Sequence, residues 1–355
     1  MVHNFNSGPS VLPKEVFEQA SQAILDYNGT GLSILEIGHR TPLFQDIIDE
    51  ALATARELMK LDKEHEILLL HGGASTQFFQ IPMNLLNENE TAAYLDCGTW
   101  GTKAIKEAKL FGNVNMVASS KDKNYTYIPK GYDIPKNSKY FHYTTNNTIE
   151  GTQMHVIPDT DVPLVADMSS DILSKTMDFN RFALVYAGAQ KNIGAAGVNM
   201  VIVRKDMLGR VTRKLPTMMD YRQHIEAGSI LNTPPVFAIY VCMLTMRWLK
   251  EQGGVAAIEK INDKKAALLY DTLDSLPIFR PTVAKEDRSK MNVVWVMEDK
   301  ELEKEFLDSC TANGMVGIQG HRTAGGFRAS LYNALPIDSV RILTELMKEF
   351  ATQKA

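Results

Sequence analysis

The alternation of strands and helices that decides the fold starts at Ile67-Leu68-Leu69-Leu70-His71-Gly72-Gly73-Ala74-Ser75-Thr76-Gln77. A short apolar run that stops at two glycines is typical of a buried strand, and the residues after the glycines open a helix. Upstream, apolar residues from Leu43 to Met59 recur at helical spacing, with charges on the other face. Further strand-like segments lie near residues 92–96, 114–118, 140–145, 163–167, 182–187 and 198–203, and the early ones alternate with helical patterns such as Trp100 to Phe111. This alternation predicts βαβ units, and therefore an α/β fold whose mainly parallel sheet has helices on both faces.

The C-terminal part of the chain has a similar alternation on a smaller scale. A helical pattern from Val255 to Leu276 is followed by two prolines that break the chain, Pro277 and Pro281. Beyond them we expect two strands and two helices, at Val293 to Met297, Phe327 to Leu331, Lys300 to Asn313 and Ile337 to Phe350. These elements predict a second, smaller α/β domain with the long helix as its hinge.

The composition is that of an ordinary globular protein. The 355 residues are 45% hydrophobic and 23% charged, with a net charge of −4, which calls for neither nucleic acid nor an anionic membrane as a partner. The N-terminus lacks the pattern of a secretory signal, and the apolar stretch Val236 to Met246 is too short to span a bilayer. Cys97, Cys242 and Cys310 are too far apart for a metal site or a disulfide framework. We therefore expect a cytoplasmic protein with no metal.

Two residues that could carry chemistry follow predicted strands. Lys191 lies in Ala187-Gly188-Ala189-Gln190-Lys191-Asn192-Ile193-Gly194, just past an apolar strand, and Asp167 ends another strand 24 residues earlier. Ligands of open α/β sheets bind at the carboxyl ends of strands. An amine that forms an imine and a carboxylate that pairs with a pyridinium nitrogen are the two groups that pyridoxal phosphate needs. The alternatives are a solvated lysine and an aspartate that only caps a helix or a turn.

Two neighbouring features fit such a cofactor. The turn His71-Gly72-Gly73 before a helix offers free backbone N–H groups and a helix dipole to an anion, although plain turn chemistry explains it as well. Trp100, at the next strand-to-helix junction, could stack on an aromatic ring or simply pack in the core. The chain lacks the G-x-G-x-x-G fingerprint, which argues against a nicotinamide-dependent enzyme.

One tetrapeptide occurs twice, as Gly38-His39-Arg40-Thr41 and as Gly320-His321-Arg322-Thr323, and Arg328 follows the second copy. Arginines in loops are mostly solvated. However, an amino acid that also carries a phosphate presents two anionic groups, and such a substrate requires several Arg and His donors.

Several short blocks occur in a fixed order along the chain. They are Asn4-Phe5-Asn6-Ser7-Gly8-Pro9, Gly38-His39-Arg40, His71-Gly72-Gly73, Asn147-Thr148-Ile149-Glu150-Gly151, Asp167-Met168-Ser169-Ser170, Tyr186 to Gly194, Asn232-Thr233-Pro234-Pro235 and Gly320-His321-Arg322. Together they resemble the phosphoserine aminotransferases, which are class V aminotransferases among the fold type I pyridoxal phosphate enzymes. The likeness runs from about residue 4 to the C-terminus, and the Ala-Gly-Ala-Gln-Lys-Asn and Asn-Thr-Pro-Pro blocks are its most specific parts.

The resemblance implies a fold and an activity. The fold has three layers around a mainly parallel seven-stranded sheet, with an N-terminal segment (1–15) that packs with the small domain, a large cofactor-binding domain (16–260) and a small C-terminal domain (261–355). The activity is the transfer of an amino group from glutamate to 3-phosphooxypyruvate, which gives O-phosphoserine in serine biosynthesis, with pyridoxal 5′-phosphate as cofactor. Three questions stay open: a further role in the 4-phosphooxy-threonine step of pyridoxine biosynthesis, another class V activity on a small amino acid and glyoxylate, and a protein that keeps the fold without catalysis.

The resemblance also implies a role for each site residue. Lys191 would bind the cofactor covalently and move the Cα proton, while Asp167 would pair with the pyridine nitrogen. The remaining cofactor-binding residues would be Trp100 against the ring, Thr148 at the phenolic oxygen, Ser169, and the phosphate-binding Ala74, Ser75 and Gln190, joined by Asn232 and Thr233 from the neighbouring subunit of a homodimer with shared active sites. The substrate-binding residues would be Ser7, His39, Arg40, His321, Arg322 and, at the α-carboxylate, Arg328. Some members have an arginine at the position of Ser75, so the anion geometry is left open.

Overall fold

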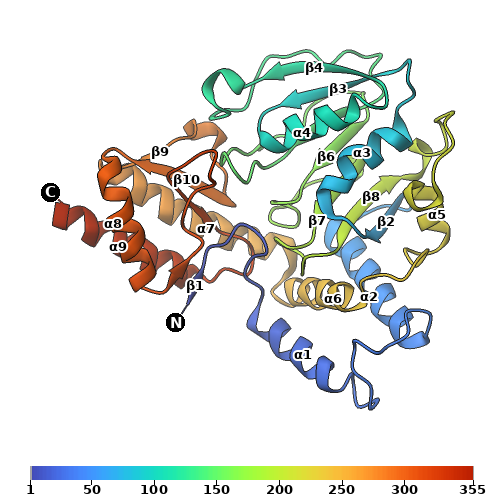
Figure 1. Cartoon of the computed structure of the whole chain (residues 1–355), viewed down its shortest axis with the longest axis horizontal. Helices are drawn as coiled ribbons and strands as arrows, with labels where there is room; N and C mark the ends of the chain where they lie inside the picture. The colour runs from blue at the N-terminus through green and yellow to red at the C-terminus, as the bar shows by residue number, and fades with distance from the viewer. Residues whose placement is uncertain (1, 355) are drawn as a thin grey trace.

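The computed structural model describes residues 2–354, and a seven-stranded sheet forms its centre (Figure 1). The strands are arranged in the order β2-β8-β7-β6-β5-β3-β4. Their bounds are β2 (His65–Leu70), β3 (Thr91–Asp96), β4 (Asn113–Ser119), β5 (Phe141–Thr144), β6 (Leu164–Asp167), β7 (Phe182–Gly188) and β8 (Asn199–Arg204). Strands β3 to β7 pair in parallel, whereas β8 runs antiparallel to both β7 and β2. The predicted mainly parallel sheet is confirmed.

The direction of β8 follows from the length of the connection before it. Residues 189–198, which join β7 to β8, form turns only. A parallel crossover needs a dozen or more residues and usually a helix, so this short segment can only return the chain antiparallel. The connection carries Lys191, which is therefore held on a short loop between two buried strands.

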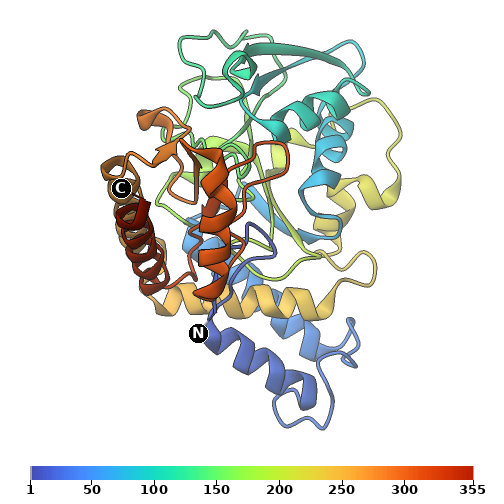
Figure 2. The same ribbon diagram turned by 60° about the vertical axis from the view of Figure 1, so that its left-hand side comes forward.

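Helices cover both faces of the sheet (Figures 1 and 2). On one face lie α1 (Lys14–Leu25), α2 (Pro42–Met59) and α6 (Val236–Glu251), and on the other lie α3 (Gly73–Leu85), α4 (Thr99–Ala108) and α5 (Tyr221–Glu226). The predicted three-layer α/β architecture is confirmed.

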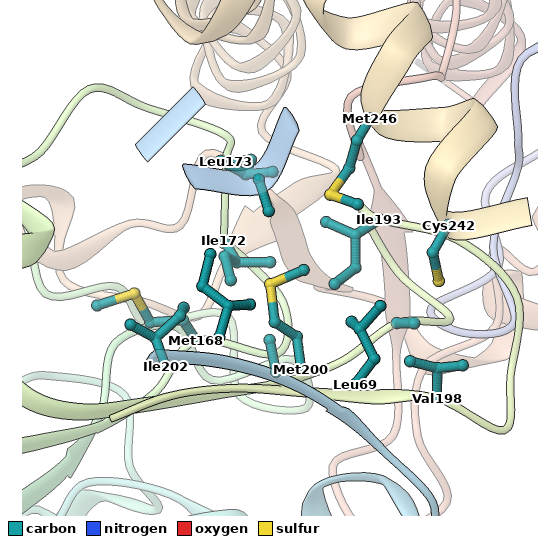
Figure 3. Packing of buried hydrophobic residues seen from close by; sticks show 14 of the residues in the cluster. Leu69, Met168, Ile172, Leu173, Ile193, Val198, Met200, Ile202, Cys242 and Met246 are labelled. Atoms are coloured by element: carbon teal, nitrogen blue, oxygen red, sulfur yellow. The ribbon is translucent and has the colours of Figure 1, made fainter. Parts of the chain in front are cut away.

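The packing of the first face holds the Lys191 loop in place. Figure 3 shows Leu69 and Met200 of the sheet on one side of Ile193, and Cys242 and Met246 of α6 on the other. A Cβ on Gly194 would lie 2.5 Å from the sulfur of Cys242, so a glycine is needed where the loop meets α6. The loop therefore has little freedom to move.

A smaller group of elements has its own apolar core and lies to the left in Figure 1. It contains α7 (Gly254–Ser275), β9 (Phe279–Pro281), β10 (Asn292–Met297), α8 (Glu303–Ala312), β11 (Met315–Val316), β12 (Phe327–Ser330) and α9 (Ile337–Lys354). Strands β12, β10 and β9 pair antiparallel, and the N-terminal β1 (His3–Asn4) pairs in parallel with β11. Phe5 is buried in this core, so the start of the chain packs with its C-terminal part.

The predicted strands and helices are all present, with shifts of a few residues at their ends. Five elements were not predicted: the two short strands β1 and β11, the helices α1 and α5, and β9, where Pro281 takes the end of an edge strand. The domain boundary at residue 260 stays a prediction, because α7 packs Ile258 into the large core and Leu269 into the small one; Met1 and Ala355 lie outside the described residues. Within residues 2–354, no helix combines the length and the apolar character that a bilayer crossing requires.

Candidate active site

A cavity of about 320 Å³ opens at the carboxyl ends of β5, β6 and β7, beside the first turns of α3 and α4. Most of the residues predicted for the site line it: Ser7, Ala74, Ser75, Trp100, Thr148, Asp167, Ser169, Gln190, Lys191, His321 and Arg328. A larger hollow of about 520 Å³, between residues 128–134 and 153–159, contains none of the predicted residues. The cavity at the strand ends is therefore the candidate active site.

The Lys191 amine points into this cavity with a single hydrogen-bond partner. Its Nζ donates to the hydroxyl of Thr148 (2.7 Å), and its backbone carbonyl accepts from the hydroxyl of Ser10 (2.6 Å). Burial lowers the pKa of the Lys191 amine to about 8; the charge of Arg328 adds to this, while Asp167 opposes it. About a tenth of the amine is thus neutral at pH 7, far more than for an ordinary lysine, and only the neutral form is a nucleophile or a base.

Asp167 is the last residue of β6 and is only 4% exposed. One carboxylate oxygen accepts from the backbone N–H (2.9 Å) and the hydroxyl (2.6 Å) of Ser169, and that hydroxyl in turn accepts from the N–H of Gly188 (3.2 Å). Burial raises the pKa of Asp167, while the hydrogen bonds from Ser169 and the charge of Lys191 oppose the rise. The aspartate does form a local turn, as one interpretation of the sequence expected, but it also forms part of the cavity wall.

Arg328, on β12, brings a buried guanidinium to the same cavity. Its Nη2 donates to the hydroxyl of Ser7 (2.7 Å) and its Nη1 to the carbonyl of Thr148 (3.1 Å), while its Nε is buried and has no partner among the described residues. A buried donor without a partner is costly unless a ligand supplies the acceptor. A carboxylate, which an arginine fork binds by two parallel hydrogen bonds, would supply it.

The first turn of α3 is suited to an anion. Gly72 and Gly73 have positive φ angles (95° and 65°), and no side chain caps the N–H groups that follow. A Cβ on Gly72 would collide with Oγ1 of Thr76, so the tight turn requires glycine. With no acidic residue in this turn, the helix dipole at Ala74 and Ser75 is left for a bound anion.

Trp100 lies in the first turn of α4, and its indole Nε1 is buried without a partner among residues 2–354. The adjacent Thr99 donates its backbone N–H (2.9 Å) and its hydroxyl (2.6 Å) to Glu150, which fixes the start of this helix. The amine of Lys103 lies 4.3 Å from the centre of the indole ring. Trp100 is thus held in the cavity wall rather than in the interior of a core.

Five predicted residues do not line the cavity: His39, Arg40, Asn232, Thr233 and Arg322. The Nδ2 of Asn232 lies 3.2 Å from the Nε2 of His71, which is 3.0 Å from the Thr233 carbonyl, and the Thr233 hydroxyl is 3.5 Å from the His39 ring. Because His71 directly precedes Gly72, this group lies beside the rim of the cavity. Arg40 and Arg322 are exposed. The roles of all five stay predictions.

Thr144 and Asn146 line the cavity but belong to none of the motifs singled out from the sequence, whereas Gly8, Ile149 and Ser170 lie in motifs without a predicted role of their own. Thr144 ends the strand predicted near residues 140–145, and Asn146 follows it. Both could be predicted from the expectation that ligands bind at the carboxyl ends of strands, which identified Asp167.

With this geometry established, comparisons with known proteins give first the class. The sequence pattern of the family described as Aminotransferase class-V matches residues 2–343, so the chain is a class V aminotransferase. The chain is 54% identical to the phosphoserine aminotransferase of Flavobacterium johnsoniae, over 98% of both chains. The chain belongs to the phosphoserine aminotransferase family.

Solved structures agree with this assignment. The phosphoserine aminotransferase from Bacillus circulans subsp. alkalophilus has a TM-score of 0.97 and 44% identity, with 100% of this chain and 99% of that chain covered. The PLP-bound phosphoserine aminotransferase from Trichomonas vaginalis has a TM-score of 0.94 and 36% identity, with 98% of this chain and 100% of that chain covered. The family, the fold and an enzyme that depends on pyridoxal 5′-phosphate, as predicted from the sequence, are confirmed.

The described residues fit this cofactor. Lys191 supplies an amine for covalent attachment, Asp167 a carboxylate for the ring nitrogen, and the uncapped start of α3 an anion site for the phosphate. The buried indole N–H of Trp100 and the Nε of Arg328 lack protein partners, as expected of groups that face bound molecules.

Proposed function

We propose that this enzyme transfers the amino group of glutamate to 3-phosphooxypyruvate, giving O-phosphoserine for serine biosynthesis and 2-oxoglutarate, and that Lys191, Asp167 and Arg328 carry the reaction. The observation that supports the proposal most directly is that these three side chains line one cavity at the ends of β6, β7 and β12. An amine, a carboxylate and a guanidinium in one cavity provide a base, a partner for a cationic ring and a receptor for the α-carboxylate of an amino acid.

Lys191 is the base. When bound, pyridoxal 5′-phosphate supplies an electron sink for the carbanion formed at the substrate Cα. The neutral amine of Lys191, positioned by the hydroxyl of Thr148, takes the Cα proton of the amino donor and later returns a proton to the Cα of the acceptor. The pKa of about 8 places the amine where it can both take up and release a proton near neutral pH.

Asp167 and its neighbours hold the ring. The Asp167 carboxylate, fixed by two hydrogen bonds from Ser169, would accept from the protonated ring nitrogen and keep the proton there. Trp100 would pack against the ring and Thr148 would bond the phenolic oxygen. Ala74, Ser75 and Gln190 would hold the phosphate.

The substrate is bound at its two ends. The Arg328 guanidinium, already fixed by Ser7 and Thr148, presents its unpartnered Nε to the α-carboxylate. His321 lines the cavity and, with the exposed Arg322, receives the distal phosphate or the γ-carboxylate of glutamate. His39 and Arg40 complete this second receptor.

The active sites are shared in a homodimer. Asn232, Thr233 and His39 form one group beside the cavity rim, yet none of them lines the cavity of their own chain. In a two-fold symmetric dimer, this group of one subunit would lie at the active site of the other subunit. There, Asn232 and Thr233 would bind the cofactor phosphate.

Mixing two inactive variants tests the shared site. Lys191→Ala subunits and subunits with Asn232→Ala and Thr233→Ala are unfolded, mixed in equal amounts and refolded, so that mixed dimers contain one intact site each. Recovery of about a quarter of the wild-type activity is expected from random pairing. If activity does not rise above the mean of the two parents, Asn232 and Thr233 do not act across an interface.

Donor and acceptor profiling tests the substrate. The purified enzyme is assayed with glutamate as donor to 3-phosphooxypyruvate, glyoxylate and the 3-hydroxy-4-phospho acceptor of pyridoxine biosynthesis, and in the reverse direction with phosphoserine and serine as donors to 2-oxoglutarate. A strong preference for phosphorylated substrates is expected, and it should fall in Arg40→Ala and Arg322→Ala because each removes a cation from the phosphate receptor. Equal use of serine and glyoxylate would favour the alternative class V activity instead. The role in pyridoxine biosynthesis and the cytoplasmic location stay predictions.

A further inference from the structure

The substrate-binding Ser7 lies on a segment that the protein holds at both ends but barely in the middle. Before it, Phe5 donates its N–H to the Val316 carbonyl (2.9 Å). After it, Ser10 donates its backbone N–H to the carbonyl of Gln190 (3.0 Å) and its hydroxyl to that of Lys191 (2.6 Å). Within the described chain, the backbone of residues 6–9 takes part in two hydrogen bonds with other residues: the Asn6 N–H donates to Oδ1 of the nearby Asn4 (3.0 Å), and the Ser7 carbonyl accepts from the hydroxyl of Tyr332 (2.9 Å). The bond from Tyr332 is the one that comes from a distant part of the described chain.

Tyr332 is itself rigidly held. Its side chain is fully buried, and its hydroxyl accepts from Nδ2 of Asn292 (3.2 Å), whose carbonyl oxygen accepts from Asn146 in the large core (2.8 Å). Its backbone carbonyl accepts from the buried amine of Lys265 (2.7 Å). Burial raises the pKa of the Tyr332 hydroxyl to about 12, so the group remains a neutral donor at any working pH.

The hydrogen bonds continue from Ser7 to the substrate receptor. The Ser7 hydroxyl accepts from Nη2 of Arg328 (2.7 Å), and Nη1 of the same guanidinium is fixed by Thr148 (3.1 Å). If residues 6–9 shifted, the Arg328 guanidinium would lose its hydrogen bond to Ser7, and its Nε would no longer be held in one position. The side chain of Tyr332 does not line the cavity.

We propose that Tyr332 is a positioning residue for recognition of the substrate α-carboxylate: through its bond to the Ser7 carbonyl it fixes the Ser7 hydroxyl, and Ser7 fixes the Arg328 fork. The inference rests on the proposed role of Arg328 in binding that carboxylate. It explains why a buried tyrosine of the C-terminal part donates its hydroxyl to a turn at the start of the chain.

The matched control for Tyr332→Phe is Tyr270→Phe. Tyr270 is also buried in the small core, and its hydroxyl donates to a backbone carbonyl, that of Ser289, at the same distance of 2.9 Å. It makes no contact with residues 6–9 or with Arg328 among the hydrogen bonds of the described chain. Both variants remove one hydroxyl that donates to a backbone carbonyl, and Tyr332→Phe also removes the bond from Asn292, so urea unfolding should show a somewhat larger loss of stability for Tyr332→Phe.

Steady-state kinetics of the holoenzyme tests the proposal. In Tyr332→Phe the KM values for phosphoserine and 2-oxoglutarate should rise about fivefold to tenfold, the worth of one hydrogen bond, while kcat changes little. Tyr270→Phe should leave both KM values unchanged. In a Ser7→Ala background, Tyr332→Phe should have no further effect on KM, because the two residues act in one chain of contacts. An unchanged KM in Tyr332→Phe, or additive effects of the two substitutions, would overturn the proposal.

Two further measurements separate the possible failures. Amide hydrogen exchange of residues 5–10 should be faster in Tyr332→Phe than in Tyr270→Phe, and equal rates would count against the proposal whatever the activity.

Phosphoethanolamine, which is phosphoserine without the α-carboxylate, should bind the wild type more weakly than phosphoserine, and Arg328→Ala should abolish this difference. If Arg328→Ala leaves the difference intact, the proposed role of Arg328 is wrong; if only the Tyr332 results fail, that role stands and the positioning inference does not.

Discussion

The protein contains two lysines with a lowered pKa whose surroundings differ in an instructive way: Lys265 is buried and Lys191 is half-buried. The pKa of Lys191 is lowered by burial to about 8, and burial also lowers the pKa of Lys265, to about 7. Lys265 is fully buried on α7, and its amine donates to three backbone carbonyls, those of Leu331 (2.9 Å), Tyr332 (2.7 Å) and Leu335 (3.3 Å). The Lys191 amine has one partner, the Thr148 hydroxyl, and it lines a cavity.

The comparison shows that a lowered pKa does not by itself mark a catalytic lysine. All three donors of the Lys265 amine are occupied, no carboxylate lies among its partners, and it lines none of the cavities described above. Lys191 combines the lowered pKa with open space, a carboxylate at Asp167 and a guanidinium at Arg328. The open space and the neighbouring groups, rather than the pKa, distinguish a reactive amine from one that stabilises a turn.

The largest effect is expected from Lys191→Ala. Removal of the base should lower kcat by about 10⁴-fold, the upper range for a positioned general base. The purified variant should also lose covalent attachment of the cofactor, which is measured by borohydride reduction and mass spectrometry. The matched change at the second lysine, Lys265→Met, should leave kcat close to that of the wild type. If kcat fell by a similar factor in both variants, the distinction between the two lysines would be wrong.

Asp167→Asn should have the next largest effect. Asparagine keeps the acceptor for the Ser169 N–H but removes the charge that stabilises a protonated ring nitrogen, so kcat should fall about 10²- to 10³-fold. Asp171→Asn is the control, because Asp171 is an equally buried carboxylate that does not line the cavity; its partners are Thr145, Gln153 and Lys175. Steady-state assays that show equal losses would mean that Asp167 acts through the fold rather than at the ring.

The same contrast explains what the sequence could and could not reveal. Lys191 and Asp167 were predicted because each follows a recognisable strand, and the carboxyl ends of strands are where ligands bind. Lys265 was not singled out, because inside the helical pattern from Val255 to Leu276 a lysine is normally on the solvated face. Its burial depends on the turn at 331–335, which is distant in sequence and which no local periodicity encodes.

Long-range pairing also limited the prediction of the site. Ser7 and Arg328 came from the family resemblance and not from spacing, and their contact depends on the start of the chain packing with the C-terminal core through β1 and β11. Helix and strand periods report only which face of an element is buried. The layers of the fold could therefore be predicted, whereas the contacts that position Arg328 required the structure.

A third prediction concerns the reactivity of Lys191 in cofactor-free protein. Because its pKa is about 8, the neutral fraction and hence the rate of labelling by trinitrobenzenesulfonate should rise with pH and level off above 8. At pH 8 a solvent-exposed lysine with a pKa near 10.4 should be labelled about 250-fold more slowly than at its own maximum. Peptide mass spectrometry gives the rate for each lysine, and a midpoint for Lys191 near 10 would contradict the account of its burial.

The smallest effect is expected for the stability of Lys265→Met, and its pH dependence tests the other half of the comparison. Loss of the amine leaves three carbonyls without a donor, so the free energy of unfolding at pH 7 should fall by about 2 kcal/mol in urea titrations.

The pKa of Lys265 is about 7 in the folded protein, which is lower than in the unfolded chain. Between pH 7 and 10 the unfolded chain therefore binds more protons than the folded protein. As a result, the wild type becomes more stable relative to the variant as pH rises. The difference between wild type and variant should therefore widen from pH 7 to 9, by at most about 1.4 kcal/mol per pH unit. Lys250→Met, which breaks an exposed ion pair with Glu57, should change stability by less than about 1 kcal/mol and show no such widening. A difference that narrows with pH would mean that Lys265 keeps its proton in the folded protein, and that its three carbonyl partners outweigh the cost of burying the charge.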